Sequence, residues 1–326
     1  MEKGQRDSAR IAMTTLNRGF EYRGRLGAEA SGLIIIDYLT RRYSGFTREE
    51  WLDRIESGRV LLDGIPATQN AVLRPGQLLS WMRPPWEEPE APLSFAILYR
   101  DQHMLAVAKP GGLPTVPGGG SFMEHTLLSL VRRHFPEASP SHRLGRGTSG
   151  IVLFARTPEA SAKISQAWRC GEILKVYRAL VAGCPPRDEF EVDTPIGPVP
   201  HWILKTMHAA CSNGKPAHSH VRVLERRDAC TLVQVRITTG RPHQIRIHLA
   251  AAGHPLIGDP LYVVGGVPAE TSRALPGDLG YYLHSELLGL LHPVTGKWTE
   301  ITCLPPPLLR LHFESNIAGA IVADHS

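Results

Sequence analysis

Alternating stretches of apolar and polar residues divide the chain into two regions of regular structure. Residues 1–24 show no sustained periodicity, so we expect a flexible N-terminal extension there. Regular patterns run through residues 25–84, and a stretch rich in proline and glutamate at 85–92 then interrupts them as an extended, semi-rigid linker. The pattern resumes over residues 93–326. We therefore predict a small domain, a linker and a larger domain.

The first region has the local signals of a small α+β unit. Thr47 followed by Glu50 forms a capping-box pattern that opens a helix running through Ile55. We expect a further helix at 33–43 and strands at 60–62 and 78–82. Four arginines lie on the helix pair, where we expect them to face phosphate, although plain solvent is the alternative: Arg41, Arg42, Arg48 and Arg54.

The second region alternates short apolar strands with two capped helices. Thr126 is placed to cap a helix at 127–134, and Thr157 with Pro158 opens another that runs to residue 169. Strands are expected at 95–99, 104–108, 151–155, 175–181, 218–224 and 231–238. Residues 184–214 are rich in proline, glycine and histidine, which favours loops or hairpins.

Composition describes a globular protein of the cell interior. The 326 residues are 42% hydrophobic and 21% charged, and no apolar run approaches the length of a membrane span. The first fifteen residues lack the apolar core of a signal peptide, and five irregularly spaced cysteines suit a reducing compartment. We therefore expect a cytoplasmic protein without a membrane partner. No H-E-x-x-H pattern or Cys/His cluster occurs, so we expect no bound metal.

The charge pattern favours an anionic partner. The formal net charge is +5, and residues 142–178 alone carry seven arginines and lysines against two glutamates. Such a basic segment is the electrostatic footprint of a nucleic-acid-binding protein, although part of it also fits an ordinary solvated helix face.

The basic segment begins with a glycine-rich loop, Ser141 to Arg156, that carries a recognisable motif. This loop resembles the signature H-R-L-D-x-x-T-S-G of the RluA-type RNA pseudouridine synthases. The residues that match are His142, Arg143, Leu144, Thr148, Ser149 and Gly150. The fifth position, an aspartate essential to catalysis in that family, is Gly145 here, and position 147 is also glycine.

Two later segments extend the resemblance in the family's order. Lys175 to Gly183 is similar to the motif K-x-Y-x-A-x-V-x-G, which implies that Tyr177 lies beside the target base. Thr239 to His248 is similar to T-G-R-x-H-Q-I-R-x-H, which implies that Arg246 pairs with the catalytic aspartate. The other residues that the resemblance assigns to RNA binding or to the loop are His142, Arg143, Leu144, Arg146, Thr148, Arg241, His243 and Leu283.

The resemblance covers about residues 95–305 and implies an α+β protein. The expected fold is that of pseudouridine synthases, with a mixed, largely antiparallel sheet flanked by helices. Residues 25–84 more loosely resemble the small RNA-binding module of a ribosomal small-subunit protein, through positions such as Gly58, Asp63 and Gly64. The implied partner is structured RNA, either rRNA or tRNA, and the implied reaction needs no cofactor.

The missing aspartate leaves three interpretations of function. The first is a working pseudouridine synthase whose nucleophile lies elsewhere, with Asp259 and Asp278 as the nearest carboxylates to motif positions. The second is a catalytically silent RNA-binding protein on the same fold, since Gly145 can act neither as nucleophile nor as base. The third, a serine hydrolase using Ser149, is weak because the loop is not a G-x-S-x-G elbow. The synthase is the leading prediction.

Overall fold

The computed structural model describes most of the chain as two compact units. The described residues are 16–43, 45–118, 120–201, 203–269, 273–312 and 314. One unit extends up to Pro89 and the other starts at Glu90, so the boundary lies inside the predicted linker 85–92. The linker is also tied down, because the Asn17 side-chain amide donates a hydrogen bond of 2.7 Å to the buried Glu88 carboxylate.

The first unit holds an antiparallel four-stranded sheet in the order β1-β4-β2-β3. β1 (Phe20–Arg25) pairs along its length with β4 (Leu78–Arg83), so the unit begins earlier than the predicted residue 25. The side chains of β1 are exposed or half-buried, and an edge strand of this kind lacks the alternation that reveals a strand. The remaining elements are η1 (Ala28–Ala30), α1 (Ile35–Arg42), α2 (Arg48–Glu56), β2 (Val60–Leu62) and β3 (Ile65–Pro66).

The predicted capping box at the start of α2 is confirmed. The Glu50 backbone N–H donates to Thr47 Oγ1 at 3.2 Å, and the Thr47 backbone N–H donates to the Glu50 carboxylate at 2.6 Å. At the start of a helix these two backbone N–H groups would otherwise lack a partner within the helix, and such a cap stabilises the helix by about 1 kcal/mol.

The arginines of this helix pair do not share one environment. Arg54 lies 4.1 Å from the ring centre of Phe46 and 5.0 Å from that of Trp81, and its side chain is only 15% exposed. Arg48 forms an ion pair with Asp37, while Arg41 and Arg42 lie exposed at the end of α1. The expectation that all four face phosphate is therefore wrong for Arg54, whose guanidinium is held among aromatic rings by cation–π contacts.

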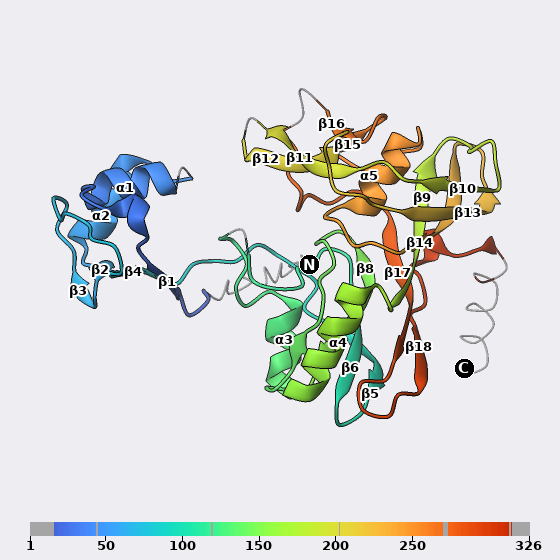
Figure 1. Ribbon diagram of the computed structural model, residues 1–326, viewed down its shortest axis with the longest axis horizontal. Coiled ribbons are helices and arrows are strands. Elements are labelled where there is room, and N and C mark those ends of the chain that lie inside the picture. Colours follow the sequence, from blue (N-terminus) through green and yellow to red (C-terminus); the bar gives the residue numbers. More distant parts are fainter. Residues whose placement is uncertain are drawn as a thin grey trace, which may run out of the picture. The chain divides into compact units, whose positions relative to one another are not determined.

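The second unit is built on one large mixed sheet (Figure 1). The main strand order is β10-β13-β14-β9-β17-β8-β6-β5, with β18 added on β17 and β7 on β8. Only the pairing of β17 with β8 is parallel among the described strand pairs, so the predicted largely antiparallel sheet is confirmed. The strands are β5 (Ala96–Arg100), β6 (Met104–Lys109), β7 (Ser139–Pro140), β8 (Ser149–Ala155), β9 (Leu174–Ala182), β10 (Glu189–Val192), β13 (Ser219–Arg226), β14 (Cys230–Ile237), β17 (Leu283–Leu291) and β18 (Trp298–Thr302).

Helices cover both faces of this sheet. α3 (Leu127–His134) and α5 (Gln244–Ala251) pack into one core, and α4 (Pro158–Cys170) packs into another. Neighbouring β6 residues divide between the two cores, Leu105 in the first and Ala106 in the second, as the alternation of a strand requires. The threonine caps predicted for α3 and α4 are confirmed. The chain also forms the hairpins β11 (Ile196–His201) with β12 (Lys205–Ala210) and β15 (Tyr262–Val263) with β16 (Val267–Pro268), and the short helix η2 (Pro307–Leu309).

A buried ion-pair cluster closes the face of β9 that looks away from α5. Arg178 lies between Glu286 and Glu314, with nitrogen–oxygen distances of 2.6 and 2.5 Å. Leu309 packs beside it against Leu180, in a small core of its own. This cluster joins β9, β17 and the segment after β18.

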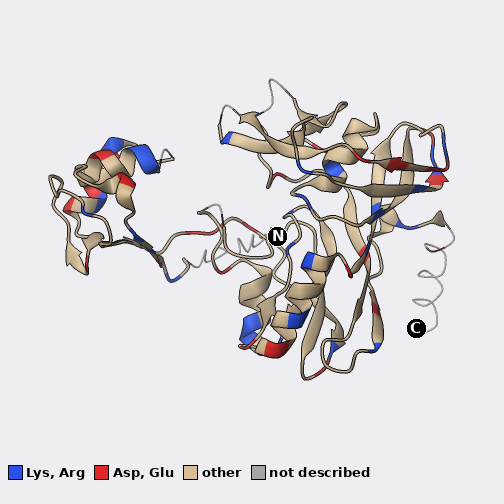
Figure 2. Cartoon of the chain, in the orientation of Figure 1, with Lys and Arg blue, Asp and Glu red and all other residues tan. Residues whose placement is uncertain are grey.

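The basic residues of the 142–178 segment are spread over several surroundings (Figure 2). Arg156 pairs with Glu137 at 2.7 Å, and Lys163 pairs with Glu159 on α4 at 2.8 Å. With Arg178 also neutralised, the segment does not form one continuous basic surface. No helix in the described part of the chain is long and apolar enough to cross a membrane.

Candidate active site

The three predicted motifs meet at one cavity of about 430 Å³ in the second unit. The residues around it come from the loop before β8, from α4 and β9, from the end of β14 and the turn into α5, from the start of α5, and from the start of β17 with the segment before it. The lining residues are His142, Arg143, Leu144, Gly145, Thr148, Trp168, Lys175, Tyr177, Ile237, Gly240, Arg241, Pro242, His243, Gln244, Ile245, Arg246, Tyr281 and Leu283. Every residue predicted for the site lies here except Arg146.

The loop that carries Gly145 is fastened to its neighbours through the main chain. Thr115 Oγ1 donates to the Leu144 carbonyl at 2.9 Å and accepts from the Leu144 N–H at 3.1 Å. Arg146 points away from the cavity, because its Nε donates to the Gly112 carbonyl at 3.0 Å. Buried Lys109 donates to the carbonyls of Arg146 and Leu113, and burial lowers its pKa to about 7. Arg146 therefore braces the loop.

The loop enters β8 through a close approach that only glycine permits. Gly150 has a φ of +108°, and a Cβ on it would lie 2.2 Å from the Ser285 carbonyl oxygen of β17. Next to it, Ser149 Oγ lies 2.8 Å from His284 Nδ1, and His284 Nε2 lies 3.0 Å from the Cys303 carbonyl. Because the carbonyl can only accept, Nε2 carries the proton and Ser149 donates to Nδ1. Both side chains are buried and neither lines the cavity, which leaves the serine-hydrolase interpretation without access to a substrate.

β9 presents Lys175 and Tyr177 to the cavity. Burial raises the pKa of Tyr177 to about 12, against a weaker opposing effect of its hydrogen bond with the Ser285 side chain. Tyr177 is therefore a neutral phenol at physiological pH. Lys175 Nζ donates to the carbonyls of Thr238 and Thr239 at 3.3 and 3.4 Å, and burial lowers its pKa.

Arg246 has an acidic partner, but that partner is not on the motif loop. Its Nε and Nη2 donate to the two oxygens of Asp259 at 2.7 and 2.6 Å, and the side chains are 3% and 1% exposed. Asp259 also accepts from the Leu261 and Tyr262 N–H groups. The implied pairing of Arg246 with a loop aspartate is thus replaced by a buried bidentate pair, and Asp259 is too enclosed to attack a substrate. Asp278, the other candidate carboxylate, accepts from the Leu275 N–H and does not line the cavity.

The turn into α5 places the remaining motif residues. His243 adopts a left-handed φ of +55° at the N-cap, and its Nδ1 lies 2.7 Å from Tyr262 Oη. Burial is the main reason that its pKa falls to about 4. Gln244 accepts from Thr239 Oγ1 and donates to the His218 carbonyl, each at 2.8 Å, so it locks the turn. Arg241 Nε donates to a backbone carbonyl at 3.0 Å, at the edge of the cavity.

Two other predicted residues, His142 and Arg143, line the cavity from the motif loop. His142 packs against Trp168 with ring centres 4.8 Å apart, and its Nε2 accepts from the Leu153 N–H. Burial lowers the pKa of His142 to about 4, so this ring is neutral. Arg143 is exposed and carries a fixed positive charge at the mouth of the cavity.

None of the described residues that line the cavity is an aspartate or glutamate. Sequence reasoning also missed a lining residue that touches the motif loop, Tyr281. A buried tyrosine outside any motif has no signal that separates it from a core residue. Trp168 also lines the cavity and belongs to no motif, whereas Lys175 opens the second motif but was not predicted as a site residue.

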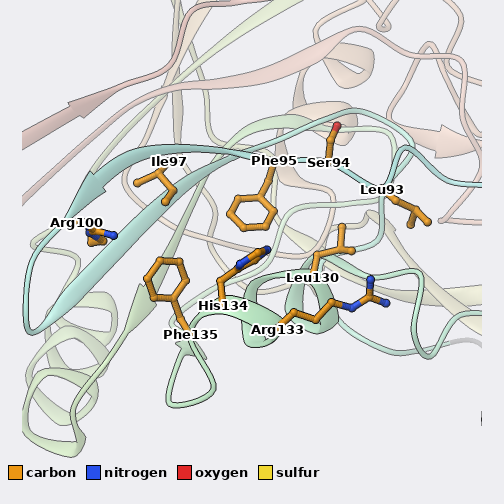
Figure 3. Close-up of a pocket in the computed structure, with 9 residues that line it drawn as sticks. All are labelled: Leu93, Ser94, Phe95, Ile97, Arg100, Leu130, Arg133, His134 and Phe135. Atoms are coloured by element: carbon orange, nitrogen blue, oxygen red, sulfur yellow. The ribbon is translucent and has the colours of Figure 1, made fainter.

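The second unit has another hollow, of about 810 Å³, between β5 and α3 (Figure 3). Phe95, His134 and Phe135 point into it, and none of its lining residues belongs to a motif. Among the described residues, one group of possible metal ligands occurs, Glu191, Asp193 and His218. It lies outside the motif cavity, so neither feature contributes to the candidate site.

Comparisons with known proteins show which family the chain belongs to. Residues 103–251 match the family described as RNA pseudouridylate synthase. The "Uncharacterized RNA pseudouridine synthase slr1592" of Synechocystis is 43% identical over 278 residues, 84% of this chain and 95% of that protein. The "Dual-specificity RNA pseudouridine synthase RluA" of Escherichia coli is 35% identical over 203 residues, 62% of this chain and 89% of that protein. The solved structure of "Human RNA Pseudouridylate Synthase Domain Containing 1" has the same fold, with a TM-score of 0.55 and 24% identity over 72% of this chain and 98% of that chain.

The chain therefore belongs to the RNA pseudouridine synthase family. Within that family it is of the RluA type, as the motifs predicted.

Proposed function

We propose that the protein converts uridine to pseudouridine in structured RNA, either rRNA or tRNA, at the motif cavity. The observation that carries this proposal is the convergence of all three motifs on one cavity beside the Arg246–Asp259 pair. The reaction breaks the bond between ribose C1′ and uracil N1, turns the base and joins C5 to C1′. It is an isomerisation, so the proposal requires no cofactor.

The cavity residues suit a flipped nucleotide. An enzyme that acts on a base in structured RNA must take that base out of its stack. We assign Tyr177 to stacking on the base, because its ring lines the cavity and a phenol with a pKa of about 12 stays protonated rather than acting as a base. Exposed Arg143 and the nearby Arg241 would contact the phosphates on either side. The first unit supports RNA binding through Arg41 and Arg42, which lie exposed at the end of α1.

Gly145 favours a second candidate, a silent RNA-binding protein on the same fold. Glycine has no group that can attack C1′ or move a proton, and the described cavity lining offers no carboxylate in its place. The two candidates share the same binding surface and differ in turnover alone.

The test is pseudouridine formation by the purified protein on unmodified transcripts of rRNA and tRNA, measured by nucleoside mass spectrometry. A Gly145→Asp variant is run in parallel. It fits sterically with a small shift, because a Cβ at Gly145 would lie 3.0 Å from Tyr281 Oη. We expect the unmodified protein to form pseudouridine. Product from the variant alone would establish the silent binder and reject the synthase.

A further inference from the structure

Tyr281 fills the space beside the two glycines that replace motif side chains. A Cβ on Gly145 would lie 3.0 Å from Tyr281 Oη, and a Cβ on Gly147 would lie 2.9 Å from two carbons of the ring. Neither glycine has a left-handed φ, so the backbone itself would accept a side chain at either position. The tyrosine ring occupies the space beside Gly147, and its hydroxyl stands next to the position that a carboxylate on residue 145 would occupy.

Tyr281 is held in place by contacts with Arg246 and Thr148. The Arg246 guanidinium carbon lies 4.2 Å from the centre of its ring, and the Asp259 pair fixes that guanidinium in place. Tyr281 Oη also lies 3.3 Å from Thr148 Oγ1, which can donate to it. These contacts fix the Tyr281 oxygen at the motif loop, next to the position that a carboxylate on residue 145 would occupy.

We propose that Tyr281 is the nucleophile of this enzyme, in place of the family's loop aspartate. This inference rests on the proposed function. Tyrosine is among the side chains that form covalent intermediates, and it attacks the anomeric carbon in sialidases. Tyr281 lines the same cavity as Tyr177, so both reach a nucleotide bound there.

The proposed step balances without an oxidant or reductant. The Tyr281 hydroxyl first gives its proton to water in the cavity. The phenolate oxygen bonds to ribose C1′ while the C1′–N1 bond breaks, and that electron pair stays on the freed uracil anion. After the base turns, C5 bonds to C1′ and the phenolate leaves with the electrons of the O–C1′ bond. The C5 proton is lost to water, and N1 and the Tyr281 phenolate each take a proton from water, which gives pseudouridine and restores the enzyme.

The test compares single-turnover pseudouridine formation on the transcripts used above. Tyr281→Phe keeps the ring that packs on Gly147 and removes only the oxygen. Tyr282→Phe is the matched control, because that side chain is 37% exposed and does not line the cavity. We expect Tyr281→Phe to lower the rate at least 100-fold with RNA affinity within twofold, and Tyr282→Phe to stay within twofold of the unmodified protein.

A double variant separates chemistry from packing. Tyr281→Phe removes the oxygen that a side chain at Gly145 would meet, so Gly145→Asp combined with Tyr281→Phe should recover at least tenfold over Tyr281→Phe alone. A Tyr281→Phe rate within threefold of the unmodified protein would overturn this inference and leave the synthase standing. An unmodified protein without any product would overturn both. Thermal melting of each variant shows whether a lost rate reflects a lost fold.

Discussion

The two faces of β9 carry opposite arrangements of charge. On the cavity face, Lys175 is held by two carbonyl oxygens and Tyr177 is a neutral phenol. On the other face, one residue further along, Arg178 is enclosed by Glu286 and Glu314. A single strand thus has a neutralised face and a face with an excess of positive charge.

This difference separates structural from functional charge. A buried cation with two carboxylates has no net positive charge left to attract a ligand, so the Arg178 cluster fastens β9, β17 and the C-terminal segment together. The cavity face lacks such compensation among its described lining residues and suits a polyanion. Basic residues also lie on elements that contribute nothing to the cavity lining, such as α3 (Figure 2), so local pairing decides the function of each charge.

Breaking the neutralised face should have the largest effect. Arg178→Met leaves Glu286 and Glu314 without their cation, at side-chain exposures of 16% and 22%. We expect the free energy of unfolding to fall by about 3–5 kcal/mol, measured by urea denaturation. Arg226→Met is the control, since its pair with Asp188 is 39% and 80% exposed and should cost less than about 1 kcal/mol. Equal losses in the two variants would contradict the structural role.

A change of pH should weaken the same cluster more gently. The hydrogen bond from Arg178 lowers the pKa of Glu314 below its ordinary value of 4.5. Stabilisation by Glu314 is therefore fully present above pH 4.5 and is lost as the pH falls through the lower, folded-state pKa. Glu314→Gln should cost roughly 1–2 kcal/mol at pH 7. We expect this difference in unfolding free energy to shrink at pH 3, and a difference independent of pH would refute the assignment.

The smallest effect is expected on the cavity face. Arg143→Ala should weaken RNA binding by about 1 kcal/mol and leave the free energy of unfolding unchanged. The slope of the logarithm of the binding constant against the logarithm of the salt concentration should become shallower by about one, because one fewer phosphate is contacted. Arg169→Ala is the matched control, because that arginine is exposed in the last turn of α4 and does not line the cavity. Filter-binding titrations at several salt concentrations distinguish the two. Indistinguishable affinities and slopes would place the RNA elsewhere.

Local signals predicted much of this structure. The Thr47 cap of α2 and the Thr126 and Thr157 caps of α3 and α4 depend on residues three apart, so the sequence displays them directly. α5 was not predicted as a helix. Every residue from Gln244 to Ala250 is buried, so the sequence lacks the alternation of an apolar and a polar helix face that reveals a helix. The edge strand β1 was not predicted for the opposite reason, since none of its side chains is fully buried and no buried positions alternate with exposed ones.

The motifs predicted which segments form the cavity, but they did not predict the partners within it. Arg246 and Asp259 belong to adjoining motif segments, yet their pairing appears only once the loop after α5 folds back. Tyr281 lies 136 positions beyond Gly145 in the sequence, and nothing in the intervening pattern links the two. Contacts of this kind depend on how the sheet brings distant strands together.

The packing of Tyr281 on Gly147 restricts the order in which such a site can change over generations. Any side chain at position 147 would collide with the tyrosine ring at 2.9 Å. The chain can therefore keep this conformation of Tyr281 only while position 147 is glycine. The loop and the tyrosine are therefore coupled, because a side chain can be added at 147 only if the ring shifts or is lost.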